Sequence, residues 1–275
     1  EDKKEILKKL DMLALTTQRA YITSIIVALS AYDDDENHDL DLLEYYRDLL
    51  MKKNEEYNKF INTNEKTEKQ KTNWATMDEL KKVQNDYRLE IVRRGLNVKE
   101  KINNSELQLI QKYLVSSLYT LQPPVRLDFA NMEIINNIDD DDNKKNYLYV
   151  KSRNTKFFIF NDFKTKSSKG SITQKINPEL NKIINFWLRF NKSKNFLLNK
   201  MNKPMTENAL GKYITRIFKI PNKKITLNLI RHIYISQNID IDKIKEEERK
   251  KEQLAESMHH STSMQKAYAK SQQKN

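Results

Sequence analysis

The sequence predicts a mostly α protein with a small antiparallel β-sheet. Only 3 Gly and 5 Pro occur among the 275 residues, and so few helix breakers favour helices over a loop-rich β-sandwich. Apolar residues recur at helical spacing along most of the chain. One stretch differs: between about 134 and 176, short apolar runs rich in aromatic and β-branched residues alternate with polar turns, which is typical of strands.

The first part of the chain predicts a small helical domain over residues 1–94. Apolar residues at helical spacing cover 4–29, with an interruption at Thr16 and Thr17, and again 40–60 and 77–91. Trp74 is a candidate core anchor between these helices. The acidic run at 33–36 has no apolar residue to bury, so we expect a solvated loop there.

A second, larger domain is expected over residues 105–275, after a linker at 95–104 that opens with Gly95. Ser105 marks a new helix start. Apolar runs at 134–135, 147–150, 157–160 and 172–176 predict the strands of the sheet, and 139–142 predicts a solvated acidic turn. Four further helices are expected at 179–190, 206–218, 227–237 and 241–258.

The composition restricts the chemistry. No Cys is present, so disulfides, thiolate zinc sites and cysteine nucleophiles are excluded. No HExxH spacing occurs among the 4 His, which disfavours metal-dependent hydrolysis. No run approaches 18 apolar residues and the first residues do not form a signal peptide, so the expected location is intracellular, in the cytoplasm or nucleus, with no membrane partner.

Charge is unevenly divided along the chain. Residues 1–150 carry 23 Lys and Arg against 28 Asp and Glu, a net of −5, whereas residues 151–275 carry 27 against 10, a net of +17. A half so basic repels itself, and phosphates that neutralise it release counterions. This asymmetry predicts a polyanionic partner for the second half, although a Lys-rich composition can also reflect an AT-rich genome.

The most informative motif lies in the last fifty residues. Asn228 and Arg231 open a helix as Asn-x-x-Arg, a later helix ends in Met258-His259-His260-Ser261, and Tyr268 follows His260 by eight residues. This order resembles the tyrosine recombinases, the phage-integrase-type family, which carry His-x-x-Arg, then Met-x-His-Ser, then a nucleophilic Tyr. One position departs from the pattern, because Asn228 stands where the family has His or Lys.

Two upstream elements complete the resemblance. Arg126, in the segment Pro124 to Phe129, matches the first catalytic arginine of the family, and Asp128 or Glu133 is expected to brace its guanidinium. The family places a catalytic lysine in a β-hairpin. The segment 158–176 predicts such a hairpin, in which Lys164 is the first choice for this lysine and Lys166 the close alternative.

The resemblance implies a site made of Arg126, Lys164, Asn228, Arg231, His260 and Tyr268. Attack of a tyrosine on a DNA phosphodiester places negative charge on the nonbridging oxygens, which arginine guanidiniums hold with paired donors. A lysine supplies the proton that the departing 5′ oxygen needs. The 3′-phosphotyrosyl bond conserves the energy of the broken linkage, so neither a metal nor a nucleotide cofactor is expected.

The resemblance also implies the architecture and the partners. The segment 15–22 is similar to the start of the family's helical core-binding domain, where a Thr caps a helix and a basic or aromatic residue faces DNA. The expected partner is double-stranded DNA bearing attachment sites, bound by a homo-tetramer that assembles on two duplexes from free monomers or dimers. The low-Gly, Lys- and Asn-rich composition is similar to that of integrases of viruses or virophages with AT-rich genomes.

Two other functions fit the same residues. A type IB topoisomerase uses a similar set as a monomer to relax supercoils. A non-catalytic DNA-binding relative is the third interpretation, and Asn228 is its only support. A purely structural interpretation of the terminal motif is that the two histidines cap a helix and the tyrosine packs against a neighbouring residue. The ordered set favours the recombinase.

Overall fold

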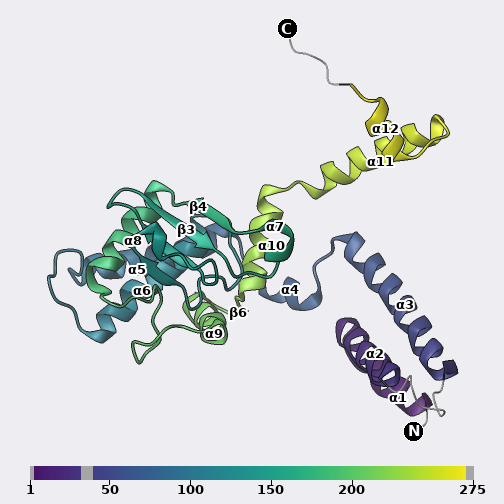
Figure 1. Cartoon of the computed structure of the whole chain (residues 1–275), viewed down its shortest axis with the longest axis horizontal. Helices are drawn as coiled ribbons and strands as arrows, with labels where there is room; N and C mark the ends of the chain where they lie inside the picture. Colours follow the sequence, from purple (N-terminus) through teal and green to yellow (C-terminus); the bar gives the residue numbers. More distant parts are fainter. Residues whose placement is uncertain (1–2, 32–39, 271–275) are drawn as a thin grey trace. The chain divides into compact units, whose positions relative to one another are not determined.

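The structure is a computed structural model that describes residues 3–31 and 40–270 (Figure 1). Helices make up about 60% of these residues. The acidic run expected at 33–36 lies outside the described residues. In the ranges that are described, no helix is both long and apolar enough to cross a bilayer. The chain divides into two compact units, residues 1–67 and 68–275.

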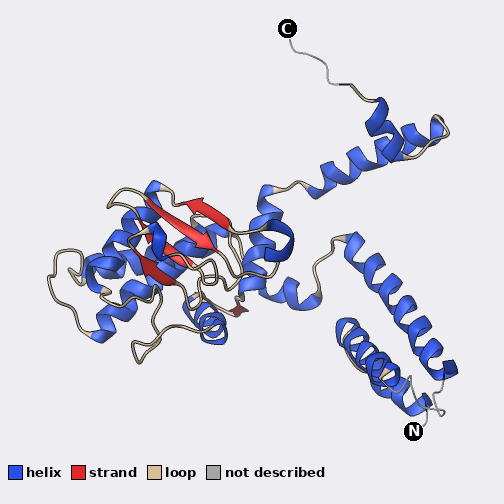
Figure 2. Cartoon of the chain, in the orientation of Figure 1, coloured by secondary structure: helices blue, strands red, loops and turns tan. Residues whose placement is uncertain are grey.

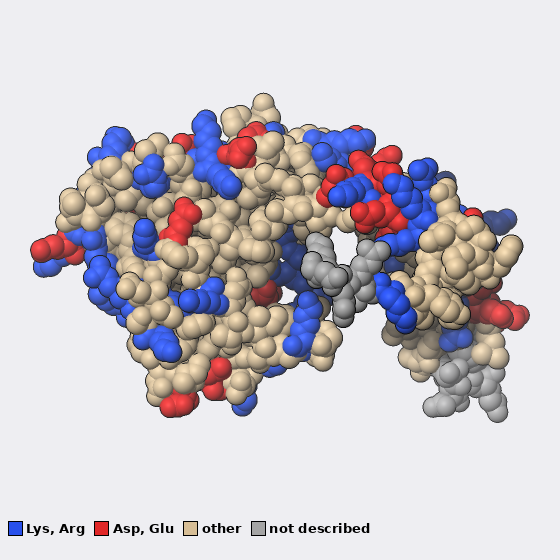
Figure 3. All heavy atoms as spheres, turned by 90° about the horizontal axis from the view of Figure 1, so that it is seen from above, with Lys and Arg blue, Asp and Glu red and all other residues tan. Residues whose placement is uncertain are grey.

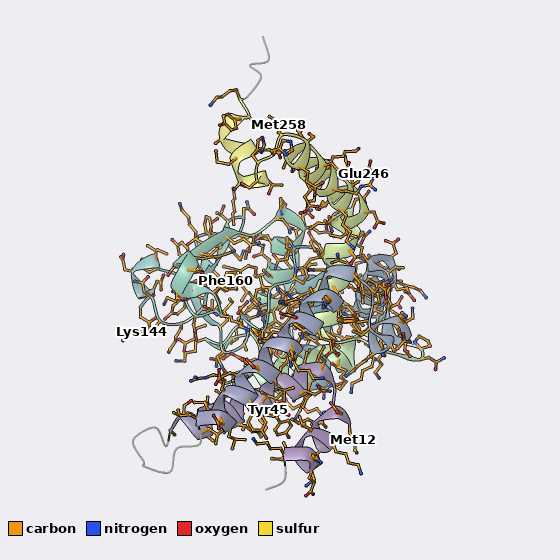
Figure 4. All side chains as sticks on the ribbon, turned by 90° about the vertical axis from the view of Figure 1, so that its right-hand side faces the viewer. Met12, Tyr45, Lys144, Phe160, Glu246 and Met258 are labelled. Atoms are coloured by element: carbon orange, nitrogen blue, oxygen red, sulfur yellow. The ribbon has the colours of Figure 1, made fainter. Side chains whose placement is uncertain are left out.

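The smaller unit contains three helices: α1 (Lys3–Asp11), α2 (Leu15–Ser30) and α3 (Leu40–Thr63). Its core is small and gathers around Leu10, Ile22 and Tyr46, one from each helix. Figure 4 labels Tyr45, which stacks edge-on against Tyr46 with ring centroids 5.3 Å apart. The expected Thr cap of α2 is wrong, because Ala14 occupies the N-cap position without a side-chain hydrogen bond.

Arg19 fastens α2 to α3. Its Nε donates to Asn54 Oδ1 at 2.6 Å, and its guanidinium lies 4.1 Å from the ring centroid of Tyr57. A cation above an aromatic face is attracted by the ring quadrupole. The basic residue that the resemblance expects at DNA is therefore used, at least in part, to hold this helix pair together.

The larger unit begins with α4 (Glu68–Asn73), α5 (Met77–Arg93) and α6 (Asn104–Thr120). The last two helices pack side by side and share one core with the rest of the unit. The structural division thus falls at residue 67, before the predicted boundary at residue 94. Leu80 and Ile91 of α5 and Leu96 are almost completely buried in the larger core, which is why α5 belongs to this unit.

Gly95 ends α5 and does not open a separate linker. Its N–H donates to the Val92 carbonyl and the Leu96 N–H donates to the Ile91 carbonyl, which are the two bonds of a Schellman cap. The backbone of Gly95 has φ +64°, a left-handed conformation that glycine adopts without a steric penalty. The buried Leu96 then carries the chain directly into the core.

A four-stranded sheet follows α6, drawn in red in Figure 2. Its strands are β1 (Glu133–Ile135), β2 (Tyr147–Val150), β3 (Lys156–Phe160) and β4 (Ile172–Lys175), in the spatial order 1-2-3-4. Strands β2, β3 and β4 pair antiparallel, whereas β1 runs parallel to β2. The sheet is therefore mixed, and the expectation of a purely antiparallel sheet is wrong. The segment between β1 and β2 holds a 3-10 turn (Ile138–Asp140) and is long enough for a crossover, which parallel pairing requires.

The remaining elements complete the larger unit. They are α7 (Lys166–Lys169), α8 (Pro178–Phe190), α9 (Glu207–Ile217), a two-stranded ribbon of β5 (Lys219–Ile220) and β6 (Lys223–Lys224), α10 (Leu227–Asn238), α11 (Ile241–Ser257) and α12 (Thr262–Tyr268). The four helices expected from 179 onward are confirmed to within one or two residues. The helical nature of residues 262–268 was not predicted.

An aromatic cluster forms the centre of the core. Phe129 is fully buried and meets Tyr119, Phe158, Phe160 and Phe196 with ring centroids 5.0–6.4 Å apart. Figure 4 labels Phe160, which lies at the end of β3. Such tilted and edge-to-face contacts stabilise a core beyond the burial of area alone. Because Phe129 is three residues from Arg126, this cluster also fixes the turn that presents Arg126.

Glu79 links the start of α5 to the β5–β6 ribbon. It forms a capping box with Thr76, and Lys223 Nζ donates to both of its carboxylate oxygens at 2.7 and 3.0 Å. The hydrogen bond from Lys223 holds the pKa of Glu79 below its ordinary value of 4.5. We expect Glu79→Gln to keep the capping box, since Gln also serves at this position, and to lose only the ion pair.

The expected cost of Glu79→Gln at pH 7 is below about 1 kcal/mol, because the pair is partly exposed. A carboxylate with a lowered folded-state pKa stabilises the protein above its unfolded pKa and loses this contribution as the pH falls through the folded value. Thermal unfolding of both proteins should thus show a difference at pH 7 that vanishes well below pH 4.5. A difference that persists in acid would contradict the ion pair.

Candidate active site

A cavity of about 820 Å³ brings together three of the predicted catalytic residues. Arg126, Lys164 and Asn228 all line it, although more than one hundred residues of sequence separate the first from the last. Its wall comes from the turn before β1, the segment after β3, the outer face of α9 and the first turn of α10.

Arg126 is held by its backbone. The Tyr119 hydroxyl donates to its carbonyl oxygen at 3.1 Å, and its N–H donates to Asp128 Oδ2 at 3.1 Å. The side chain itself is exposed and faces the cavity. Among the described residues, the hydrogen bonds of Arg126 are thus made by its main chain, and none is found for its guanidinium.

Asp128 is half-buried beside two arginines. Burial raises the pKa of its carboxyl, while the backbone hydrogen bond from Arg126 and the positive charges of Arg126 and Arg231 oppose this shift. Asp128 thus bonds to the main chain of Arg126, and no ion pair between its carboxylate and the Arg126 guanidinium is found among the described residues. Glu133, the alternative brace, pairs instead with Lys145 at 2.9 Å and Lys194 at 3.6 Å, so its expected role at Arg126 is not supported.

Lys164 and Lys166 have different surroundings. Lys164 is exposed, follows β3 by four residues and lines the cavity. Lys166 opens α7, and its Nζ donates to the Asn143 carbonyl at 3.0 Å; it is not among the residues that line the cavity. This arrangement favours Lys164 as the lysine that meets a ligand there. Both residues do lie in the connection between β3 and β4, as the hairpin prediction expects.

Helix α10 presents Asn228 and Arg231 at its start. Thr226 caps the helix by accepting a hydrogen bond from the Leu229 N–H, so Asn228 lies in the first turn. Arg231 follows three residues later and therefore lies on the same side of the helix. Free N–H groups and the helix dipole make such a first turn favourable for an anion.

His260 and Tyr268 form a second group, His260 in the connection between α11 and α12 and Tyr268 at the end of α12. Their ring centroids lie 6.0 Å apart, and Gln265 Nε2 donates to the Lys251 carbonyl at 2.9 Å, which fastens the short α12 to α11. The structure brings these two residues to each other but not to the cavity, whose lining includes neither. Residues Ile239 and Asp240 connect α10 to α11.

The Met-x-His-Ser motif has a clear local explanation. Met258 is the C-cap of α11, His259 has φ +55°, and the N–H groups of His259 and His260 donate to the Glu256 and Ala255 carbonyls. These are the bonds of a Schellman cap, so the helix-capping interpretation of the histidines holds for their backbone. Ser261 then caps α12.

The two ring nitrogens of His260 have different surroundings. Its Nδ1 lies 3.2 Å from the Ser261 carbonyl oxygen, which favours the tautomer with a proton on Nδ1. Its Nε2 is buried and has no hydrogen-bond partner in the described part of the chain. The Tyr268 residue is 66% exposed.

Basic and acidic side chains both line the cavity that contains Arg126, Lys164 and Asn228. Lys144, Lys145, Arg126 and Lys164 line the cavity together with four carboxylates, from Asp128, Glu133, Asp162 and Glu207. Figure 3 shows Lys and Arg spread over the visible face of the larger unit. Over the described ranges, no three His, Asp or Glu side chains are placed to bind a metal ion.

Sequence reasoning missed the side chain that joins the walls of the cavity. Asn146 lies just before β2, is 7% exposed and lines the cavity between Arg126 and Lys164. An Asn ahead of an apolar strand is a common turn residue, so the sequence offers no signal of a longer-range role.

Comparisons with models of protein families, with curated proteins and with solved structures found no match.

Proposed function

We propose that this protein is a site-specific tyrosine recombinase or integrase, which cuts and rejoins DNA strands through a 3′-phosphotyrosyl intermediate. The observation that carries the proposal is the cavity shared by Arg126, Lys164 and Asn228, with Arg231 one helical turn beyond. Motif order along the chain does not require these residues to meet. Asn228 lies in the first turn of α10, where the helix N-terminus favours an anion, and this supports a phosphodiester as the ligand.

The proposed reaction assigns one task to each group. Arg126 and Arg231 hold the nonbridging oxygens, and Asn228 donates a neutral hydrogen bond to the same phosphate. The Tyr268 oxygen attacks phosphorus, with His260 as the neighbour that accepts its proton or donates to a nonbridging oxygen. The bond to the 5′ oxygen breaks, and Lys164 donates the proton that this oxygen takes. In the DNA complex, α11 and α12 must bring Tyr268 to the phosphate.

The test is a covalent adduct with DNA. We expect the protein to form an adduct with a nicked duplex bearing its attachment site, and expect this adduct to survive denaturant without any metal or nucleotide. Peptide mapping should place the nucleotide on Tyr268. Duplex binding that weakens with salt, without any adduct, would instead identify a non-catalytic DNA-binding protein.

A second assay separates recombinase from topoisomerase. A recombinase forms adducts at one sequence and exchanges strands between two duplexes as a tetramer. Relaxation of any supercoiled plasmid by a monomer would overturn the recombinase proposal and identify a type IB topoisomerase.

Asn228 provides a graded prediction. We expect Asn228→Leu to slow adduct formation by about 10²-fold, the usual cost of one donor to a developing oxyanion. Asn228→His should retain or raise the wild-type rate, since an imidazole can donate and also carry charge. Single-turnover adduct formation at saturating DNA measures both. Equal rates for Asn228→Leu and wild type would remove Asn228 from the site.

A further inference from the structure

Asn146 occupies an unusual position among the side chains around the cavity. It lies at the end of the segment that connects β1 to β2, and its carbonyl oxygen accepts a hydrogen bond from the Glu133 N–H at 3.1 Å. Its side-chain amide is turned away from this backbone pairing and lies between two other segments. One segment carries Arg126, and the other carries Lys164.

The amide of Asn146 uses its full hydrogen-bonding capacity. Nδ2 donates to the Asp128 carbonyl at 2.9 Å and to the Asp162 carbonyl at 2.8 Å. Oδ1 accepts from the Asn161 N–H at 2.9 Å and the Asp162 N–H at 2.8 Å. An amide has two donors and two acceptor lone pairs, so no other side chain of this size can make all four bonds.

All four partners are main-chain atoms, which makes this a bridge between two backbones. Asp128 is two residues after Arg126, and Asp162 is two residues before Lys164. When a buried hydrogen bond breaks, its polar groups have no other partner and stay unsatisfied, which is costly. Such bonds therefore hold the two backbone segments at a fixed separation. The segment after β3 has further bonds to the β1–β2 connection, since the fully buried Asn161 donates from Nδ2 to Asp141 Oδ1 at 2.7 Å and to the Lys145 carbonyl at 2.9 Å.

We propose that Asn146 is a positioning residue that sets the spacing between the Arg126 guanidinium and the Lys164 ammonium. This inference rests on the proposed function, in which Arg126 holds the phosphate and Lys164 protonates the leaving oxygen of the same phosphate. Both groups have long, exposed side chains, so their separation depends on the positions of the two backbone segments that Asn146 joins. Catalysis by positioned groups is sensitive to displacements of about 1 Å, which cost roughly 10²-fold in rate.

The structure offers a matched control in Asn191, which is 5% exposed. Its Nδ2 donates to the Asn195 carbonyl at 2.9 Å, and its Oδ1 accepts from the Ser193 N–H at 3.0 Å. It is thus an equally buried amide bonded to main-chain atoms in the same unit. The loop that it holds carries none of the proposed catalytic residues.

The experiment compares Asn146→Ala with Asn191→Ala in the full chain, at a temperature at which both remain folded. We expect similar losses of thermal stability. Duplex affinity should stay within threefold of wild type for both variants. Single-turnover adduct formation should fall about 10²-fold for Asn146→Ala and less than threefold for Asn191→Ala. Equal rates for the two variants, or a loss of affinity that accounts for the loss of rate, would overturn the positioning role.

Amide hydrogen exchange provides a readout that does not depend on activity. We expect Asn146→Ala to accelerate exchange in both 126–130 and 161–165, while Asn191→Ala leaves both unchanged. Asn146→Asp keeps the acceptor for the Asn161 and Asp162 N–H groups but loses the donors to the Asp128 and Asp162 carbonyls. This variant thus retains two bonds to the 161–165 segment and none to the 126–130 segment. It should therefore accelerate exchange mainly in 126–130.

The two readouts separate the inference from the function on which it rests. If wild-type protein forms no adduct but exchange follows the pattern above, the bridge exists and the recombinase proposal fails. If wild type forms the adduct and exchange in Asn146→Ala changes in only one of the two segments, the bridge is wrong and the function stands.

Discussion

Tyr268→Phe should abolish the covalent adduct with DNA. The substitution removes one hydroxyl from a side chain that is 66% exposed, so no core contact is lost and the fold should remain intact. The proposed reaction has no other nucleophile, and loss of a nucleophile typically lowers a rate by more than about 10⁴-fold. The measurement is the yield of denaturant-resistant protein–DNA complex on a nicked duplex.

The control for Tyr268→Phe is duplex binding, which should match wild type. A nearby variant, Ser263→Ala, lies on the same short helix and should retain the adduct. An adduct that persists in Tyr268→Phe would show that another residue is the nucleophile. Loss of both the adduct and duplex binding would place Tyr268 in DNA recognition instead.

Lys164→Ala should slow strand cleavage by about 10²- to 10⁴-fold, the range typical of general acid catalysis. The departing 5′ oxygen would then leave as an unprotonated alkoxide. Lys166→Ala should change the rate little, because the Lys166 ammonium bonds to the Asn143 carbonyl and does not line the cavity. Single-turnover cleavage of the same duplex by both variants measures the difference.

A sulfur substitution in the DNA tests the role of Lys164 more directly. When the bridging 5′ oxygen at the scissile phosphate is replaced by sulfur, the leaving group departs as a thiolate and needs no proton. We expect Lys164→Ala to cleave this substrate at nearly the wild-type rate. A defect that persists on the sulfur substrate would mean that Lys164 binds the phosphate and is not the proton donor. A defect confined to Lys166→Ala would reverse the assignment of the two lysines.

The helices and strands were largely predictable, because their signals are local. Periodicity placed α5, α8, α10 and α11 close to their observed bounds, and alternating apolar runs placed the four strands of the main sheet. The direction of β1 was not predictable. An apolar run predicts a strand but not the direction of that strand in the sheet. Parallel or antiparallel pairing depends on the path of the segment that connects the two strands.

The sequence predicted which residues belong to the candidate site, but it did not predict how they are arranged in space. Arg126, Lys164 and Asn228 were chosen from motif order, and the cavity unites them. The sequence left Lys164 and Lys166 as alternatives, whereas the structure favours Lys164, because the Lys166 ammonium donates to the Asn143 carbonyl. Glu133 was a reasonable brace in sequence, yet Lys145 and Lys194 lie closer to it.

The sequence by itself determined which of the longer segments are helical, where the basic charge lies and which residues form the ordered set that ends at Tyr268. These properties depend on neighbours within a few positions, or on composition. Only the tertiary structure decided that α5 belongs to the larger core, that β1 is parallel to β2 and that Asn146 bridges the Arg126 and Lys164 segments. Burial and hydrogen bonding between distant segments decide such features, because they depend on which surfaces meet when the chain folds.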